Sequence, residues 1–180
     1  MPACPADLFC IRYGPEGFVM VLNSHQRATI EAAAARIIPA DHDPGALEAG
    51  VIDYIEQALA THDGDHAQLY FDGVRELDEL ARQQFTTEAF SSLGPEQQDR
   101  ILRLLEEKGS PFFSLLVRHT MEGFYGDPRH GGNKNRVGWT MLGFPGPSYP
   151  KGYSSPLGWY DGHLPDEFAS PKKRSDHEPE

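Results

Sequence analysis

A stretch rich in both glycine and aromatic residues, residues 120–147, most constrains what this chain can fold into. Glycine loses more backbone freedom on folding than other residues, so an ordered segment keeps many glycines only where the backbone needs positive φ angles or close contacts. Disordered segments are poor in aromatic residues, whereas this stretch includes Phe124, Tyr125, Trp139 and Phe144. The sequence therefore predicts an ordered, irregular loop that packs against a surface.

The overall composition limits the class of protein. The 180 residues are 39% hydrophobic, which is enough for one core, so a single domain is expected. The formal net charge of -11 argues against nucleic-acid binding, because that affinity depends on clustered Lys and Arg side chains. No segment approaches the roughly 20 apolar residues of a membrane-spanning helix, so no membrane insertion by this chain is expected.

The N-terminal residues bear on redox state and location. Two reduced thiols, Cys4 and Cys10, are favoured over a disulfide in a chain of this size, and the pair provides no metal-ligand set. The apolar run at residues 18–22 is too short for a signal peptide, and no twin-arginine pair precedes it. The chain as given is therefore expected in the cytoplasm.

Three parts are predicted along the chain: an N-terminal arm at residues 1–23, a helical body at 24–122, and an irregular wrapping segment with a polar tail at 123–180. Two short β-rich runs, residues 8–13 and 18–22, flank a Gly-Pro-Glu-Gly linker and predict a hairpin. The predicted fold class is mainly α. It is a small helical bundle with a β-hairpin-like N-terminal arm and a long irregular C-terminal arm rich in glycine, proline and aromatic residues.

The spacing of apolar residues predicts the helices of the body. Ser24 is the expected N-cap of the first helix, and Leu47 is expected on the buried face of the second. Pro95 and Pro111 each suit the first turn of a later helix. The helix that Pro111 opens is so apolar that it is expected to be nearly central. The predicted helices cover residues 24–38, 47–59, 66–85, 95–108 and 111–121, with a further helical turn in 87–93.

Beyond Gly123 the helical spacing ends. The remaining chain contains at most one short strand-like run, at residues 137–142, and is otherwise expected to be irregular. So long a segment without regular structure is unusual inside a compact domain. It is therefore expected to wrap a surface, either its own or that of a partner.

Few residues suggest chemistry. His119 and Glu122 lie three apart on one helical face and His130 follows, so a metal site or an acid–base pair can be drawn. The chain contains no H-E-x-x-H, G-x-S-x-G, P-loop or G-x-G-x-x-G motif. A stand-alone metal-dependent enzyme that uses His119, Glu122 and His130 is kept as the alternative function. The alternating carboxylates and imidazoles of residues 62–66 are favoured as a linker over a metal site.

The polar residues of the glycine-rich stretch have a structural interpretation. A tight turn is favoured over phosphate binding at residues 131–133, because the surroundings are acidic and no strand precedes them. A backbone without regular structure needs other hydrogen-bond partners. The polar side chains expected to provide them are Glu122, Asp127, Arg129, Asn133 and Arg136.

Two runs carry a resemblance to a known family. The run M-E-G-F-Y-G-D-P-R-H-G-G-N-K-N-R-V-G-W-T-M-L-G-F-P-G-P resembles the signature of the gluconate 2-dehydrogenase subunit 3 family. Upstream, A-A-A-A-R-I-I-P-A-D-H-D-P-G-A-L-E-A-G-V-I-D-Y-I is similar to that family's opening helix, Pro-Asp loop and second helix. The resemblance covers about residues 24–147.

The resemblance implies a helical, non-catalytic small subunit of a heteromeric sugar dehydrogenase. In such complexes a large FAD-containing subunit of the glucose-methanol-choline type oxidises the sugar, and the small subunit acts like a chaperone by supporting its folding and stability. No cofactor is then expected in this chain, FAD is expected in the partner, and a cytochrome or another electron acceptor could join through that partner. Members often begin with a twin-arginine signal, which residues 1–23 lack. A periplasmic location is the alternative if a signal was removed or the partner is exported by other means.

The residues expected to contact the partner or to fix the motif lie in the glycine-rich stretch and in the aromatic tail. Without the family, a partner surface and the chain's own helices are equal alternatives for the aromatic side chains. The residues are Glu122, Gly123, Tyr125, Asp127, Pro128, Arg129, Gly131, Gly132, Asn133, Gly138, Trp139, Gly143, Phe144, Pro145, Gly146, Trp159 and Tyr160.

Overall fold

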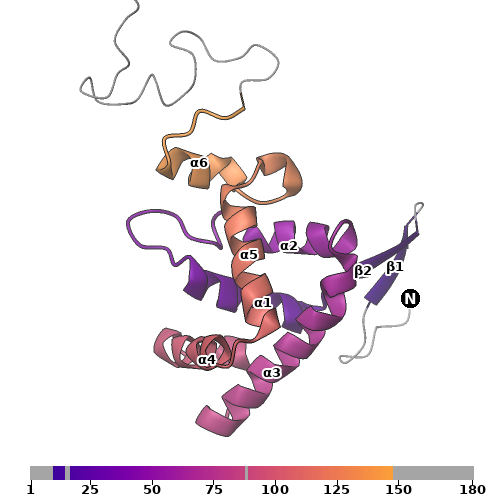
Figure 1. The fold of residues 1–180 in the computed structure, drawn as a ribbon, viewed down its shortest axis with the longest axis vertical. Helices are drawn as coiled ribbons and strands as arrows, with labels where there is room; N and C mark the ends of the chain where they lie inside the picture. The colour runs from indigo at the N-terminus through magenta and orange to yellow at the C-terminus, as the bar shows by residue number, and fades with distance from the viewer. Residues whose placement is uncertain (1–9, 15–16, 88, 148–180) are drawn as a thin grey trace, which may run out of the picture. The chain divides into compact units, whose positions relative to one another are not determined.

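The computed structural model describes residues 10–14, 17–87 and 89–147, and this part of the chain is mainly helical, as predicted (Figure 1). The strands are β1 (Cys10–Gly14) and β2 (Gly17–Val21), which pair antiparallel with Cys10 opposite Val21. The α-helices are α1 (Ser24–Ile37), α2 (Val51–Ala60), α3 (Ala67–Phe85), α4 (Pro95–Glu107), α5 (Pro111–Tyr125) and α6 (Val137–Met141). Short 3-10 helices are η1 (Gly64–His66), η2 (Phe90–Ser92), η3 (Pro128–His130) and η4 (Lys134–Arg136).

Parts of both predicted arms lie outside the described residues. These parts are residues 1–9 and 15–16 of the first arm and 148–180 of the second, which include Trp159 and Tyr160. The chain divides into two compact units, Met1–Phe144 and Pro145–Glu180, and all the helices named above belong to the first. In the part of the chain that the structure describes, no helix has both the length and the apolar content needed to cross a membrane.

Local capping signals explain where several helices begin. Asn23 caps α1, because its side-chain oxygen accepts the Gln26 N–H at 2.9 Å and the Gln26 side chain accepts the Asn23 N–H at 2.9 Å. Ser24, the predicted cap, is instead the first helical residue, because only a cap at position 23 places a glutamine where it can return the bond. Pro95 and Pro111 occupy the first turns of α4 and α5, as predicted.

The start of α2 differs from the prediction. The helix begins at Val51 because Gly50 adopts a φ of 64°, which interrupts helical backbone geometry. Residues 46–50 form turns before the helix, and the Val51 N–H donates to the carbonyl oxygen of Ala46. Leu47, predicted on the buried face, is therefore 54% exposed.

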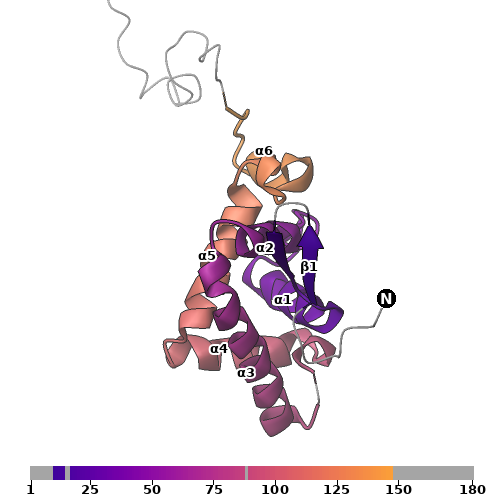
Figure 2. The ribbon, with the colours of Figure 1, turned by 90° about the vertical axis from the view of Figure 1, so that its right-hand side faces the viewer.

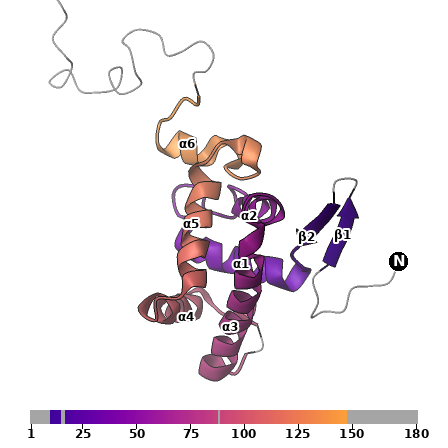
Figure 3. The ribbon, with the colours of Figure 1, turned by 45° about the vertical axis from the view of Figure 1, so that its right-hand side comes forward.

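The central position predicted for α5 is confirmed. This helix contacts α1, α2, α3, α4 and α6, and Phe112, Leu116 and Phe124 along its length are completely or almost completely buried. Phe112 lies on Gly73 of α3, where an added Cβ atom would come 2.1 Å from the ring. The turned views in Figures 2 and 3 show α6 at the C-terminal end of α5 and α4 at its opposite end.

The backbone after Gly123 is more regular than predicted. The helix α5 continues to Tyr125, and residues 137–141 form α6 where a strand-like run was predicted. That prediction was wrong because a helix of this length has little more than one turn. So few residues do not distinguish the helical spacing of apolar residues from the alternation of a strand. Contacts with α5 hold this short helix in place.

Candidate functional site

The glycine-rich loop is held to the end of α5 by Asn133, which is completely buried. Its backbone N–H donates to the carbonyl oxygen of Gly123 at 2.7 Å, and its Nδ2 donates to that of Gly126 at 2.8 Å. Its Oδ1 accepts the backbone N–H of Gly138 at 2.9 Å. One side chain thus connects the end of α5, the loop that follows and the first turn of α6.

Two glycines of the motif are required by close backbone contacts. A Cβ atom added at Gly132 would lie 2.1 Å from the carbonyl oxygen of Gly123, and one added at Gly138 would lie 2.1 Å from that of Phe124. Gly131 and Gly143 instead have positive φ angles, of 97° and 63°. Both of the reasons expected for glycine in this stretch therefore occur in it.

Trp139 of α6 packs against the end of α5. It is 7% exposed, and its Nε1 donates to the carbonyl oxygen of Tyr125 at 2.7 Å. The rings of Trp139 and Phe144 meet edge to face, with centroids 5.1 Å apart, and the Phe144 N–H donates to the Trp139 carbonyl oxygen at 2.7 Å. The indole therefore lies in the chain's own packing and is unavailable to a partner in this arrangement.

The turn before the loop is stabilised locally. Pro128 opens η3, and Asp127 accepts hydrogen bonds from the Arg129 backbone N–H at 3.0 Å and from its guanidinium at 2.8 Å. These contacts with Arg129 lower the pKa of Asp127 to about 2. Pro145 and Gly146 belong to the second unit of the chain, where Gly146 has a φ of 101°.

Lys134 connects the loop to α2. Its backbone N–H donates to the Ala49 carbonyl oxygen at 2.9 Å, and its ammonium pairs with Asp53. Its side chain passes so close to Gly50 that an added Cβ atom there would lie 2.6 Å from the lysine Cδ. Arg27 of α1 binds the other oxygen of Asp53 at 2.7 Å, so one carboxylate joins two helices and the loop.

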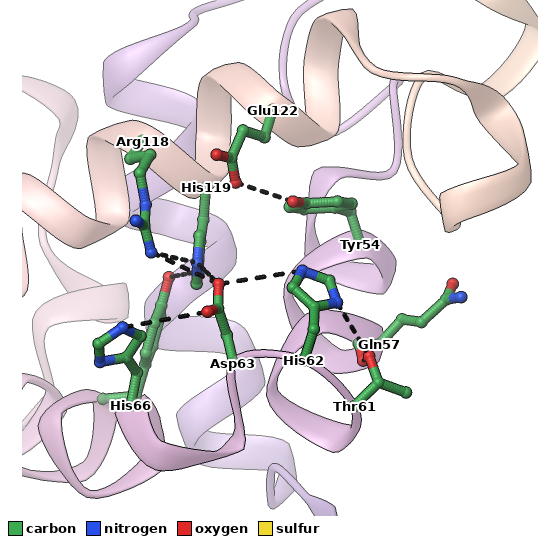
Figure 4. A network of polar contacts seen from close by, with 10 residues as sticks. Tyr54, Gln57, Thr61, His62, Asp63, His66, Arg118, His119 and Glu122 are labelled. Atoms are coloured by element: carbon green, nitrogen blue, oxygen red, sulfur yellow. Dashed lines mark hydrogen bonds and ion pairs between the residues drawn. The ribbon is translucent and has the colours of Figure 1, made fainter.

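A second polar network lies between α5 and the α2–α3 connection (Figure 4). Asp63 accepts a hydrogen bond from His119 Nε2 at 2.8 Å, and the His119 Nδ1 lies 3.0 Å from the hydroxyl of Tyr70. A neutral His119 protonated on Nε2 satisfies both contacts, because Nδ1 then accepts the tyrosine proton. The three side chains join α3, the connection and α5.

The burial of this network shifts its pKa values. Burial lowers the pKa of His119, although the hydrogen bond with Asp63 acts in the opposite direction. Burial opposes ionisation of Asp63, but the hydrogen bond from His119 and the charge of Arg118 outweigh it, so the Asp63 pKa is lowered. Burial also raises the pKa of Tyr70, which keeps its hydroxyl protonated as the donor.

Glu122 forms part of the contact between α5 and α2. It accepts a hydrogen bond from the Tyr54 hydroxyl at 2.8 Å, as Figure 4 shows. Gly123, the next residue, lies against the ring of Tyr54, where an added Cβ atom would be 3.1 Å away. Burial, followed by the contact with Glu122, raises the pKa of Tyr54.

The structure does not assemble the metal or acid–base set of the alternative function. Both ring nitrogens of His119 are engaged, Glu122 binds Tyr54, and His130 is an exposed residue of η3. Among residues 10–14, 17–87 and 89–147, no three or more His, Cys, Asp and Glu side chains are arranged to hold a metal ion. The alternative is not supported because a shared position on a helix does not reveal which tertiary contacts occupy each side chain.

Sequence reasoning missed Asp63 and Tyr70 as partners of His119. Residues 62–66 do connect two helices, as expected, but Asp63 also anchors the connection to α5. The available signal was a histidine within the very apolar sequence of α5, because a buried imidazole needs polar partners.

Arg136 also differs from its prediction: its backbone is hydrogen-bonded, whereas its side chain makes no hydrogen bond to another described residue.

Comparison with known proteins adds one finding. Residues 24–146 match the family model described as gluconate 2-dehydrogenase subunit 3, so the resemblance noted in the sequence is confirmed over nearly the same range. The match extends from the start of α1 through the glycine-rich loop. Neither the curated proteins nor the solved structures gave a match.

Proposed function

The chain belongs to the gluconate 2-dehydrogenase subunit 3 family, and we propose that it is the non-catalytic small subunit of a heteromeric FAD-dependent sugar dehydrogenase. In this proposal a large subunit of the glucose-methanol-choline type binds FAD and oxidises the sugar. The small subunit supports the folding and stability of that partner. The observation that carries the proposal is the family match, which extends over α1 to α6 and the loop between the last two helices.

The use of the polar side chains supports a non-catalytic role. His119, the most buried imidazole described, binds Asp63 and Tyr70, and Glu122 binds Tyr54. These contacts join helices to one another. A catalytic acid or base instead has to reach a proton on a bound substrate.

The glycine-rich loop supports a role in presenting a surface. Its conformation is specified by Asn133 and by close contacts at Gly132 and Gly138. A loop ordered before binding loses less entropy when a partner binds.

The location in the cytoplasm remains a prediction, as does a cytochrome or another electron acceptor that joins through the partner.

Co-expression with a large FAD-binding dehydrogenase subunit from the same source tests the proposal. We expect the two chains to purify together, with flavin absorbance in the complex and none in the isolated small subunit. Stoichiometric flavin in the isolated chain, or separate elution of two soluble chains, would contradict the proposal.

A further inference from the structure

The connection between α2 and α3 is held to α5 by one carboxylate. This connection, residues 61–66, is here called the cover, because its Asp63 lies against the imidazole of His119 (Figure 4). Within the described part of the chain, the backbone hydrogen bonds of the cover are made within it or to the adjoining ends of α2 and α3. Its hydrogen bonds to α5 come from Asp63 alone, which binds His119 Nε2 at 2.8 Å and Arg118 at 3.4 Å.

The imidazole beneath the cover has all its hydrogen bonds satisfied only when it is neutral. His119 is completely buried, its Nε2 donates to Asp63, and its Nδ1 accepts from the Tyr70 hydroxyl at 3.0 Å. A proton added to Nδ1 would leave the buried hydroxyl of Tyr70 without its acceptor. A buried charge and a buried donor without a partner both cost free energy. The closed arrangement therefore suits the neutral imidazole.

The other charged and titratable groups around His119 do not reverse this preference. They are Tyr54 of α2, Asp63 of the cover, Tyr70 of α3, and Arg118 and Glu122 of α5. Burial has the largest effect and lowers the pKa of His119, although Asp63 and Glu122 act in the opposite direction. Once the cover moves away, water reaches the imidazole and its pKa returns towards the ordinary 6.5. Acidification below pH 6.5 therefore favours the open state, which binds the proton more readily.

Two further histidines belong to the cover itself. The Nε2 atoms of His62 and His66 lie 3.9 and 4.0 Å from the carboxylate oxygens of Asp63, on either side of it in Figure 4. When protonated, they attract that carboxylate. Because both histidines move together with Asp63, this attraction is present in the closed and the open state and does not change the direction of the acid response.

We propose that the cover is a pH-sensitive element, closed over neutral His119 at neutral pH and opened when His119 takes up a proton. No residue of the cover is buried, and segments with few buried contacts open at the lowest free energy. The helices on either side are held by other contacts. The Tyr54 hydroxyl of α2 binds Glu122 of α5, and Phe112 of α5 lies on Gly73 of α3. The cover can therefore open while the bundle stays folded.

Amide hydrogen–deuterium exchange of the full chain at about pH 7.5 and about pH 5.5 tests the proposal. After correction for the intrinsic exchange rate at each pH, the protection of residues 61–67 reports how often the cover opens. We expect the cover to be less protected than α4 at both pH values. Its protection should fall by up to about tenfold at the lower pH, because opening is linked to one proton below pH 6.5.

Two variants identify the titrating group. His119→Gln removes the buried imidazole and should abolish the fall in protection between the two pH values. His130→Gln replaces an exposed histidine and should retain it. An unchanged protection of the wild-type cover, or the same fall in His119→Gln, would overturn the proposal. Equal protection of the cover and α4 would show that the cover opens only by global unfolding, which would overturn it too.

A second pair of variants tests the contact that holds the cover. Asp63→Ala removes the hydrogen bonds to α5 and should lower the protection of residues 61–67 at about pH 7.5 by at least about tenfold. Asp65→Ala removes an exposed carboxylate of the same cover and should leave the protection unchanged. Circular dichroism checks that each variant keeps its helices. Equal protection in the two variants would contradict the role of Asp63 and, with it, the proposal.

Discussion

Asn133 donates its backbone N–H to the carbonyl oxygen of Gly123 at 2.7 Å, which ties the glycine-rich loop to the last turns of the central helix. The same residue binds Gly126 and Gly138 through its side chain. Asn133 therefore makes three hydrogen bonds, one to the end of α5, one to the residue after it and one to α6. Changes at this position should affect the loop without removing apolar core.

Asn133→Ala should destabilise the isolated chain by roughly 1–3 kcal/mol, because the half-buried carbonyl oxygen of Gly126 and the buried N–H of Gly138 lose their partner. Asn135→Ala is the matched control. Asn135 has a similar positive φ of 56° but is exposed, so its replacement changes the backbone preference without removing buried hydrogen bonds. Chemical denaturation of both variants measures the difference, and equal losses would show that the two side-chain hydrogen bonds of Asn133 add little.

Gly132→Ala should destabilise the chain through a steric clash. The new Cβ atom would lie 2.1 Å from the Gly123 carbonyl oxygen, which is backbone and cannot rotate away. Overpacking of this kind costs about 1–3 kcal/mol, occasionally more. Gly94→Ala serves as the control because the nearest atom to its new Cβ would be 3.7 Å away. A melting temperature for Gly132→Ala as high as that of Gly94→Ala would refute the close-contact argument.

Trp139→Ala should reduce the stability of the isolated chain by roughly 3–5 kcal/mol, the usual range for a buried tryptophan or phenylalanine. The indole is 7% exposed, and its removal leaves the Tyr125 carbonyl oxygen without its donor. Met141→Ala, in the same helix but 43% exposed, should lower stability much less. A variant of Trp139 that melts like the wild type but loses the partner would instead place the indole in the interface.

Acidification should destabilise the chain partly through His119. Its folded-state pKa lies below the ordinary value of 6.5, so the unfolded state binds the proton more readily and stability falls as pH drops below that value. The lowered pKa of Asp63 extends the loss to more acidic pH, below its ordinary 3.8. The charged or titratable groups around His119 are Tyr54, Asp63, Tyr70, Arg118 and Glu122.

A melting series from neutral to acidic pH measures this dependence. His119→Gln should be less stable at neutral pH and should lose less further stability between neutral pH and about pH 5. His130→Gln changes an exposed histidine of η3 and should follow the wild-type curve. Parallel curves for the wild type and His119→Gln would show that His119 does not contribute to the acid response.

Local signals in the sequence explain the predictions that succeeded. Pro95 and Pro111 mark the starts of α4 and α5, because proline suits the first helical turn. This preference is local and does not depend on tertiary contacts. The density of apolar residues in α5 likewise predicts its central position, since a helix with so many apolar residues is buried on more than one side. The resemblance to the family was identified from long runs of residues, and the family model matches the part of the chain that contains them.

Tertiary contacts explain the predictions that failed. Leu47 fits the apolar spacing of α2, yet the left-handed Gly50 ends that spacing before the helix starts. Asp63 and His119 are 56 residues apart in sequence, so no local pattern indicates their hydrogen bond. The helix α6 is recognisable only from its contacts with α5, because five residues define no clear period.

We propose that this chain stabilises a large FAD-containing partner, and the yield of that partner with and without the chain tests this most directly. The large dehydrogenase subunit would be expressed alone, with the wild-type chain, and with Asn133→Ala. Soluble, flavin-loaded protein would be quantified by absorbance after size separation. We expect a high yield with the wild type, a reduced yield with Asn133→Ala and little when the chain is absent. Equal yields of active, flavin-loaded dehydrogenase in all three cases would contradict the account.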